Sequence, residues 1–129
     1  MNAVYVAAPF EQRAFAALLA SNLRRDANLE VTSRWLFEES NLDAEWAQKD
    51  LDDIDRADAL VALNAESWKT SGTGGRHVEL GYALAREKTI VLVGVRSNIF
   101  HYHPSVLLVS WHDALNLSAV VADALERAK

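Results

Sequence analysis

The chain contains no cysteine and only two prolines and five glycines among its 129 residues. Without cysteine there can be no disulfides, no thiolate zinc sites and no cysteine nucleophiles. Basic residues are also in the minority, because 13 Lys and Arg face 18 Asp and Glu and give a formal net charge of −5. An acidic chain without a Lys/Arg cluster is poorly suited to bind nucleic-acid backbone or an anionic membrane surface.

Long apolar runs are missing as well. No stretch approaches the ~18 residues of a membrane span, and the N-terminus lacks a charged-then-apolar signal pattern. We therefore expect a soluble, cytoplasmic protein whose partners include no membrane and no nucleic-acid polymer. The length and the 50% share of hydrophobic residues suit one domain, over residues 1–129, with a buried core.

Short apolar runs alternate with segments of helical periodicity along the chain. The inner runs show no polar alternation, which is typical of strands buried on both faces. Strands are predicted at residues 3–8, 29–33, 59–63, 89–93 and 106–110, the second being the more exposed one. Helices are predicted at residues 10–25, from an N-cap at Asp43 to 56, at 76–87 and at 117–127.

This alternation favours an α/β fold of three layers, flavodoxin-like (Rossmann-like), with a five-stranded parallel sheet. Right-handed crossovers make the strand order 2-1-3-4-5 the most plausible one. In such sheets ligands bind beyond the carboxyl ends of the strands, at the switch point between strands 1 and 3. The segments 7–13, 64–79 and 94–104 are therefore the places to look for a site.

Four of the five glycines lie within ten residues, and three of them, Gly72, Gly74 and Gly75, are in a loop that leads into the predicted helix 76–87. The free N–H groups at the start of a helix can hold an anion such as a phosphate. The loop is not a P-loop, because no Lys follows the glycines, and it is not a dinucleotide fingerprint, because His77 stands where a third Gly is needed. It is either an anion cradle or simply a loop before a helix.

Two carboxylates are candidates for chemistry. Glu79 is expected in the first turn of the helix after the glycines, where the helix dipole would keep it ionised and suited to act as a nucleophile or a base. The alternative is that it merely stabilises the helix start. On the helix that ends at 56, Ala47, Leu51 and Ile54 form the expected apolar stripe, and Asp50 lies at its edge, where it can point into a cleft.

Other polar and aromatic residues give weaker signals. Asp52, Asp53 and Asp55 are expected on a solvated helix face. His101 and His103 alternate in a loop, but no Cys, Asp or Glu nearby completes a ligand set, so no metal site is predicted. Tyr5 is expected in the core by its position, and the four scattered Trp residues are expected to serve packing.

Three segments together resemble the nucleoside 2-deoxyribosyltransferase family, which includes the related nucleoside 5′-monophosphate N-glycosidases. They are Val4-Tyr5-Val6-Ala7-Ala8-Pro9-Phe10, Asp50-Leu51-Asp52-Asp53-Ile54 with Ala57-Asp58, and Gly72-Thr73-Gly74-Gly75-Arg76-His77-Val78-Glu79-Leu80-Gly81-Tyr82-Ala83. Their order and spacing agree with the family from residue 3 to about residue 94, and the Glu-Leu-Gly-Tyr-Ala block is the most specific piece.

The resemblance implies that Glu79 attacks the anomeric carbon of a sugar and expels the base, giving a glycosyl-enzyme that a second base or water resolves. It implies that Asp50 and Tyr5 position the nucleoside and the nucleophile. It also implies substrate contacts from Ala8, Pro9, Phe10, Thr73, Gly74, Gly75 and Arg76, and from Asn98 supplied by a neighbouring subunit of a homo-oligomer.

The chemistry fits these residue types independently of the resemblance. A fixed carboxylate beside the anomeric carbon stabilises an oxocarbenium-like transition state, and a second carboxylate or a water can protonate the leaving base. No metal or organic cofactor is expected. Three interpretations stay open: a (deoxy)nucleoside transferase, a nucleoside 5′-monophosphate N-glycosidase, and a nucleotide-binding module without turnover. Arg13 and Arg76 could bind a phosphate or pair with surface carboxylates.

Overall fold

A parallel sheet forms the centre of the molecule. The computed structural model describes residues 2–39, 41–68 and 74–129, and within them the strands follow the order β2-β1-β3-β4-β5. Every neighbouring pair is parallel, so the predicted flavodoxin-like fold is confirmed. The strands are β1 (Ala3–Ala7), β2 (Glu30–Val31), β3 (Ala59–Asn64), β4 (Thr89–Gly94) and β5 (Val106–Val109).

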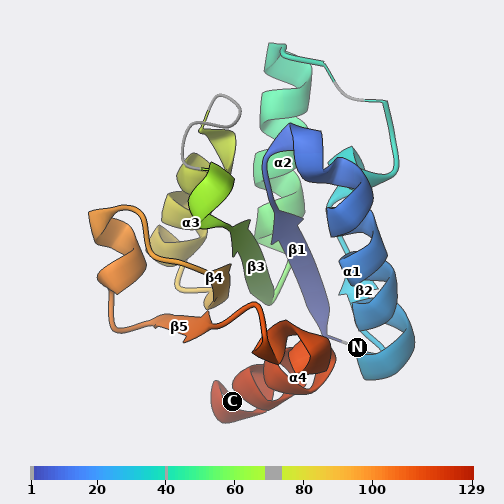
Figure 1. Ribbon diagram of the computed structural model, residues 1–129. Helices are drawn as coiled ribbons and strands as arrows, with labels where there is room; N and C mark the ends of the chain where they lie inside the picture. Colours follow the sequence, from blue (N-terminus) through green and yellow to red (C-terminus); the bar gives the residue numbers. More distant parts are fainter. Residues whose placement is uncertain (1, 40, 69–73) are drawn as a thin grey trace.

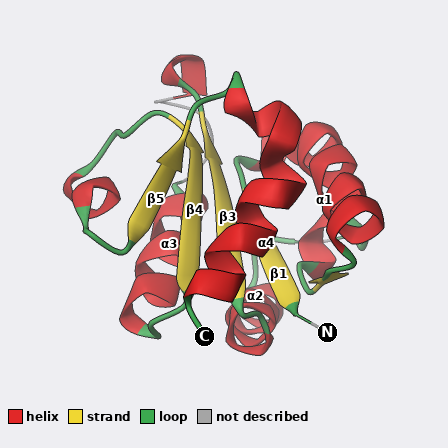
Figure 2. Cartoon of the chain, turned by 90° about the horizontal axis from the view of Figure 1, so that it is seen from below, coloured by secondary structure: helices red, strands yellow, loops and turns green. Residues whose placement is uncertain are grey.

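Helices cover both faces of the sheet. Helices α1 (Arg13–Ala27) and α4 (Leu117–Arg127) pack side by side on one face, and α2 (Ala44–Arg56) and α3 (Gly75–Ala85) pack on the other (Figures 1 and 2). Each right-handed crossover from a strand through a helix to the next parallel strand places a helix on a face in this way. Within the described residues no helix has the length and apolar character needed to cross a bilayer.

The central strands are buried along their whole length. All residues of β1 and β3 are buried, as are the four central residues of β4. Val, Ile and Leu dominate these strands because layers of helices above and below leave no face for polar side chains. The core therefore runs through the sheet and holds the carboxyl ends of β1 and β3 side by side, where Ala7 pairs with Ala62.

The second strand differs from its prediction. It ends at Val31, and residues Thr32 and Ser33 turn inward and are buried rather than exposed. The Ser33 hydroxyl accepts a hydrogen bond from the Val6 backbone N–H (3.2 Å), and the Thr32 hydroxyl donates to the Asp53 carbonyl (2.7 Å). The Thr32 backbone N–H still donates to the Val4 carbonyl at 2.9 Å, and beyond it side-chain hydrogen bonds hold this edge in place of further strand pairing.

Helix α2 begins as predicted and buries a different stripe. The Asp43 carboxylate caps the helix by accepting from the Trp46 N–H at 2.9 Å. The expected stripe is wrong in part, because Ala47 is exposed and Trp46, Asp53 and Ile54 are the buried residues. An aromatic ring at Trp46 replaces Ala47 as the first contact with the core.

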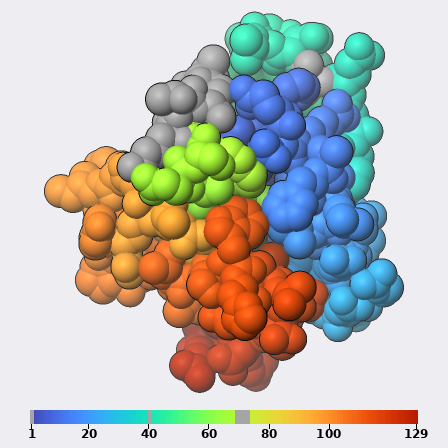
Figure 3. Space-filling view, viewed as in Figure 1, coloured from blue at the N-terminus to red at the C-terminus, as the bar shows by residue number. Residues whose placement is uncertain are grey.

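A close approach of β3 and β4 at their carboxyl ends explains the glycine that lies outside the cluster. Gly94 has φ of +116°, and a Cβ there would come within 1.8 Å of the Asn64 carbonyl oxygen and 2.7 Å of the Trp111 indole nitrogen. Any larger residue is therefore excluded at this position. Trp111 in turn packs against Trp68 and Phe15, with ring centroids 5.5 and 5.8 Å apart. In Figure 3 the bright green segment after β3 correspondingly lies between the start of α1 and the orange segment after β5.

Candidate active site

A cavity of about 420 Å³ opens beyond the carboxyl ends of β1 and β3, at the switch point of the sheet. Its volume is within the range of small-molecule sites. Three elements form its walls: the segment after β1, the segment that leads into α2 together with α2 itself, and the start of α3. The lining residues are Ala8, Pro9, Phe10, Glu11, Trp35, Asn41, Leu42, Trp46, Asp50, Gly74, Gly75, Arg76 and Glu79.

Tyr5 and Glu79 form a hydrogen-bonded pair beneath this cavity. Tyr5 is fully buried in β1, and its hydroxyl donates to the carboxylate of Glu79 on α3. The expectation that Tyr5 lies in the core is therefore met in position, yet its hydroxyl is directed at the carboxylate that the sequence singles out. The register of β1 against β3 and the packing of α3 on β3 bring the two side chains together.

The electrostatic expectation for Glu79 is wrong. Helix α3 begins at Gly75, so Glu79 lies in the second turn, where the effect of the helix dipole has fallen off. Removal from water raises its pKa from the usual 4.5 to about 8, and the nearby charge of Asp50 adds to this. The Tyr5 hydrogen bond opposes the shift because it favours the charged form. Glu79 is thus mostly protonated at pH 7 in the free protein.

Asp50 reaches the same cavity from α2. Its Oδ1 atom is buried and has no hydrogen-bond partner within the part of the chain that the structure describes. Burial raises its pKa to about 6; the negative charge of Asp53 adds to the shift, while the positive charge of Arg34 opposes it. With one pKa near 6 and the other near 8, Asp50 and Glu79 together hold about one proton at pH 7.

Asp53, three residues further along α2, is a correction to the predicted solvated face. Its side chain is completely buried. The guanidinium of Arg34 donates to it at 2.9 Å, that of Arg56 at 2.5 Å, and the Arg34 backbone N–H at 3.0 Å. Asp52 is exposed as predicted, and Asp55 is half-buried and accepts from Tyr82 and Arg86.

Aromatic side chains line the cavity, and sequence reasoning named Phe10 among them but missed Trp35 and Trp46. Trp35 donates its indole N–H to the Val6 carbonyl (2.9 Å), and its ring centroid is 6.4 Å from that of Phe10. Trp46 lies one helical turn before Asp50, and that spacing is the signal that could have placed it in the site. Phe10 and Leu42 are 56% and 95% exposed, so apolar surface extends to the cavity mouth.

The glycine segment contributes through its last two members. Gly74 adopts φ of +83° as the N-cap of α3, and a Cβ on Gly75 would meet no atom within 4 Å. Thr73, which the sequence also assigns to this loop, falls outside the described residues. Arg76 is buried at the cavity wall, where its guanidinium donates to the Trp68 carbonyl at 2.9 Å and contacts the Asn64 side chain at 3.4 Å.

The other candidate residues lie elsewhere. Arg13 does not line the cavity, and its guanidinium donates to the Leu36 and Glu38 carbonyls at 3.1 and 2.8 Å. Asn98 does not line the cavity of its own chain. It caps a short 3-10 helix by accepting from the Phe100 N–H, and its amide nitrogen lies 3.3 Å from ring nitrogens of His77 and His101. In the described residues no cluster of three or more His, Cys, Asp or Glu could hold a metal.

Comparisons with known proteins support the fold. No family model and no curated protein sequence matches this chain. Among solved structures, the CMP N-glycosidase BcmB of Clostridium botulinum is similar with a TM-score of 0.65 and 18% identity, over 93% of this chain and 98% of that one. The TIR domain of a Toll-related receptor from Hydra magnipapillata has the same TM-score with 14% identity, over 99% and 98%. Both comparisons show a shared architecture.

Proposed function

We propose that this protein is an enzyme that cleaves the N-glycosidic bond of a nucleoside or nucleotide. The observation that carries the proposal is the convergence of two carboxyl groups on one cavity: Glu79, hydrogen-bonded by a buried tyrosine, and Asp50, with an unpartnered buried oxygen. Enzymes that cleave glycosidic bonds usually use two carboxyl groups whose pKa values differ, one as the nucleophile or base and one as the acid.

Glu79 is the proposed nucleophile. Its ionised carboxylate attacks the anomeric carbon as the C–N bond breaks, and the bonding electrons leave with the base. Asp50 supplies the proton that the departing nitrogen takes up, directly or through a water. In the second step Asp50, now ionised, takes a proton from the incoming water as the water oxygen attacks the anomeric carbon and releases Glu79. A second base in place of water gives exchange instead of hydrolysis.

The proton shared by the two carboxyls has to lie on Asp50 when Glu79 attacks. The hydrogen bond from Tyr5 favours this arrangement because it stabilises the charged form of Glu79. The positive charge that develops on the sugar in the transition state favours it further, since an anion beside an oxocarbenium-like centre is stabilised. Burial keeps Tyr5 protonated as a donor, because it raises the pKa of the hydroxyl well above its usual value.

The walls suit a nucleoside in shape. Phe10, Trp35 and Trp46 offer ring surfaces against which a planar base can pack, and Asp50 and Glu79 line the same cavity from α2 and α3. The likeness to a CMP N-glycosidase and the sequence resemblance to deoxyribosyltransferases both support this class of substrate. Asn98 is proposed to complete the site of a neighbouring subunit in a homo-oligomer, since it is absent from the lining of its own cavity.

A nucleotide-binding module without turnover is the second candidate. It is favoured by the equal TM-score of the chain with a receptor TIR domain, which shows that this architecture also occurs in a receptor. The two candidates differ in one measurable respect: the module binds a nucleoside or nucleotide and releases no free base.

The test is incubation with deoxynucleosides, ribonucleosides and their 5′-monophosphates, with and without a free acceptor base, followed by chromatography for base release or exchange. We expect release from at least one compound and a loss of at least about 10³-fold in Glu79→Gln. Glu39→Gln, an exposed residue that does not line the cavity, is the matched control. Mass spectrometry should find a glycosyl adduct on the native protein and none on Glu79→Gln. Full activity in Glu79→Gln would contradict the mechanism, and binding without base release would favour the module.

A further inference from the structure

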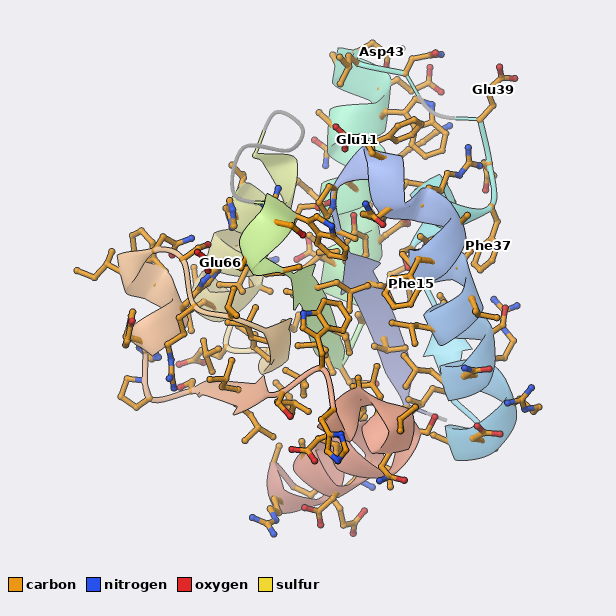
Figure 4. The ribbon with its side chains drawn as sticks, viewed as in Figure 1. Glu11, Phe15, Phe37, Glu39, Asp43 and Glu66 are labelled. Atoms are coloured by element: carbon orange, nitrogen blue, oxygen red, sulfur yellow. The ribbon has the colours of Figure 1, made fainter. Side chains whose placement is uncertain are left out.

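Glu11 is a lining residue that the proposed chemistry leaves without a role. It follows Phe10 in the short 3-10 helix between β1 and α1, and Figure 4 shows it at the same end of the molecule as Asp43. Its side chain is exposed, and within the described residues no hydrogen bond or ion pair holds its carboxylate. An exposed, unrestrained carboxylate at a cavity wall acts on a ligand through its charge.

The cavity carries an unusual charge balance for a site that would bind a phosphate. Arg76 is the one basic side chain among its described lining residues. Against it stand Glu11 and the Asp50–Glu79 pair, which holds about one proton and therefore about one negative charge at pH 7. The net formal charge of the described lining is thus about −1.

Arg76 does not reverse this balance. Its guanidinium is buried and bonded to the Trp68 carbonyl and the Asn64 side chain. Glu11 lies close enough for its charge to raise the pKa of Arg76 against the lowering caused by burial. The positive charge of Arg76 is therefore already offset by Glu11, and the partial charge at the start of α3, roughly +0.5, is smaller than one carboxylate.

We propose that Glu11 is a specificity-determining residue that makes the cavity favour uncharged nucleosides over nucleoside 5′-monophosphates. The inference rests on the proposed function, because it presumes that the cavity holds a nucleoside. The mechanism is repulsion: a phosphate brings up to two negative charges toward lining residues that, among those described, already carry a net negative charge, whereas a hydroxyl brings none.

The test measures binding with turnover blocked. In a Glu79→Gln background, the dissociation constants of deoxyadenosine, deoxycytidine and their 5′-monophosphates are determined by calorimetry at low salt. We expect the parent to bind each nucleoside more tightly than its monophosphate. Glu11→Gln should move the ratio of the two constants toward the monophosphate by about three- to tenfold, and Glu11→Lys by about ten- to a hundredfold.

A control variant separates the effect of a charge at the cavity wall from the effect of the net charge of the protein. Glu39→Lys makes the same change of net charge at an exposed residue that does not line the cavity, and should move the ratio by less than about twofold. The preference of the parent should also weaken as salt is raised, because Glu11 is exposed and screened.

The outcomes separate the two proposals. If nucleosides and monophosphates both bind and the ratio is the same in Glu11→Lys and the parent, the role of Glu11 is overturned while the proposed function stands. A parent that prefers monophosphates overturns it equally. If none of the four compounds binds or reacts, the proposed function itself fails and the inference fails with it.

Discussion

Asp50 and Asp53 lie three residues apart on one helix, and both have carboxylates removed from water, yet they are in opposite situations. Asp53 is completely buried and receives hydrogen bonds from two arginines and a backbone N–H. Asp50 is less buried, and one of its oxygens has no partner in the described residues. Its pKa is raised to about 6, whereas the arginines around Asp53 compensate its charge.

The difference teaches that burial does not by itself mark a functional carboxylate; incomplete pairing does. Buried polar groups in native proteins nearly always have hydrogen-bond partners, so the unpartnered Asp50 oxygen at the cavity wall indicates a group that can bind a ligand. Asp53 with Arg34 and Arg56 ties α2 to the segment after β2, and thereby fixes the helix face from which Asp50 points into the cavity. One carboxylate is structural, and the other is the proposed acid.

The largest expected effect is on stability. Asp53→Asn should lower the free energy of unfolding by about 3 kcal/mol, because it leaves the Arg34 guanidinium without its buried counter-charge. Asp50→Asn should change it by less than about 1 kcal/mol or raise it, since a neutral amide removes a poorly solvated charge. Urea denaturation at pH 7 measures both. Equal losses in the two variants would mean that Asp50 has a structural partner and would remove the contrast.

The next effect is on catalysis by Asp50. The parent should show a bell-shaped pH dependence of kcat/KM with limbs near 6 and 8, because activity requires one proton on the pair. Asp50→Asn should lower kcat/KM by about 100-fold. The pH profile of kcat/KM in this variant should keep only one ascending limb, with its midpoint below pH 8, because loss of the Asp50 charge lowers the pKa of Glu79. An unchanged bell in this variant would refute the shared proton.

A smaller effect is expected from the buried tyrosine. Tyr5→Phe removes the hydrogen bond that favours ionised Glu79, so the pKa of Glu79 should rise and the descending limb should move to higher pH. At pH 7 kcat should fall about tenfold while KM changes little. Tyr82→Phe, which loses a hydroxyl bonded to Asp55 outside the cavity, is the control. If both variants lose the same activity, Tyr5 does not act through Glu79.

The sequence predicted most element positions because apolar runs and helical spacing are local, and it predicted the sheet order because right-handed crossovers leave few arrangements of five parallel strands. Helix α4 has the predicted bounds, and Asp43 caps α2 as expected. The predicted strand 29–33 shortened because Thr32 and Ser33 form side-chain hydrogen bonds to residues distant in sequence. No local pattern reports such partners.

The same limit explains the site. Spacing and resemblance singled out Glu79 and Asp50, and both line the cavity. The protonation of Glu79 could not be anticipated, because it depends on solvent exclusion and on Asp50 from another helix. Asp53 was predicted to be exposed because local spacing does not show that Arg34, from another segment, and Arg56, at the end of the same helix, would pair with it. Glu11 belonged to no recognisable motif.

The smallest expected effect is on how the free energy of unfolding depends on pH, and it tests whether Glu79 shares a proton with Asp50. Glu79 has a pKa near 8 in the folded protein and about 4.5 when unfolded, so between these values the folded state holds a proton that the unfolded state has lost. The contribution of Glu79 to the free energy of unfolding must therefore fall as pH rises through this window and stay level outside it. Glu79→Gln cannot ionise and should be free of this decline. Below about pH 4.5 the free energies of unfolding of the variant and the parent should differ only by a constant offset. By pH 8 the variant should have gained on the order of 1 kcal/mol relative to the parent. This figure allows for solvent screening and for the altered Tyr5 hydrogen bond. Urea denaturation across this range measures the gain. A parallel pair of stability curves would mean that Glu79 is ionised at neutral pH like an ordinary carboxylate, and the shared proton with Asp50 would then have no basis.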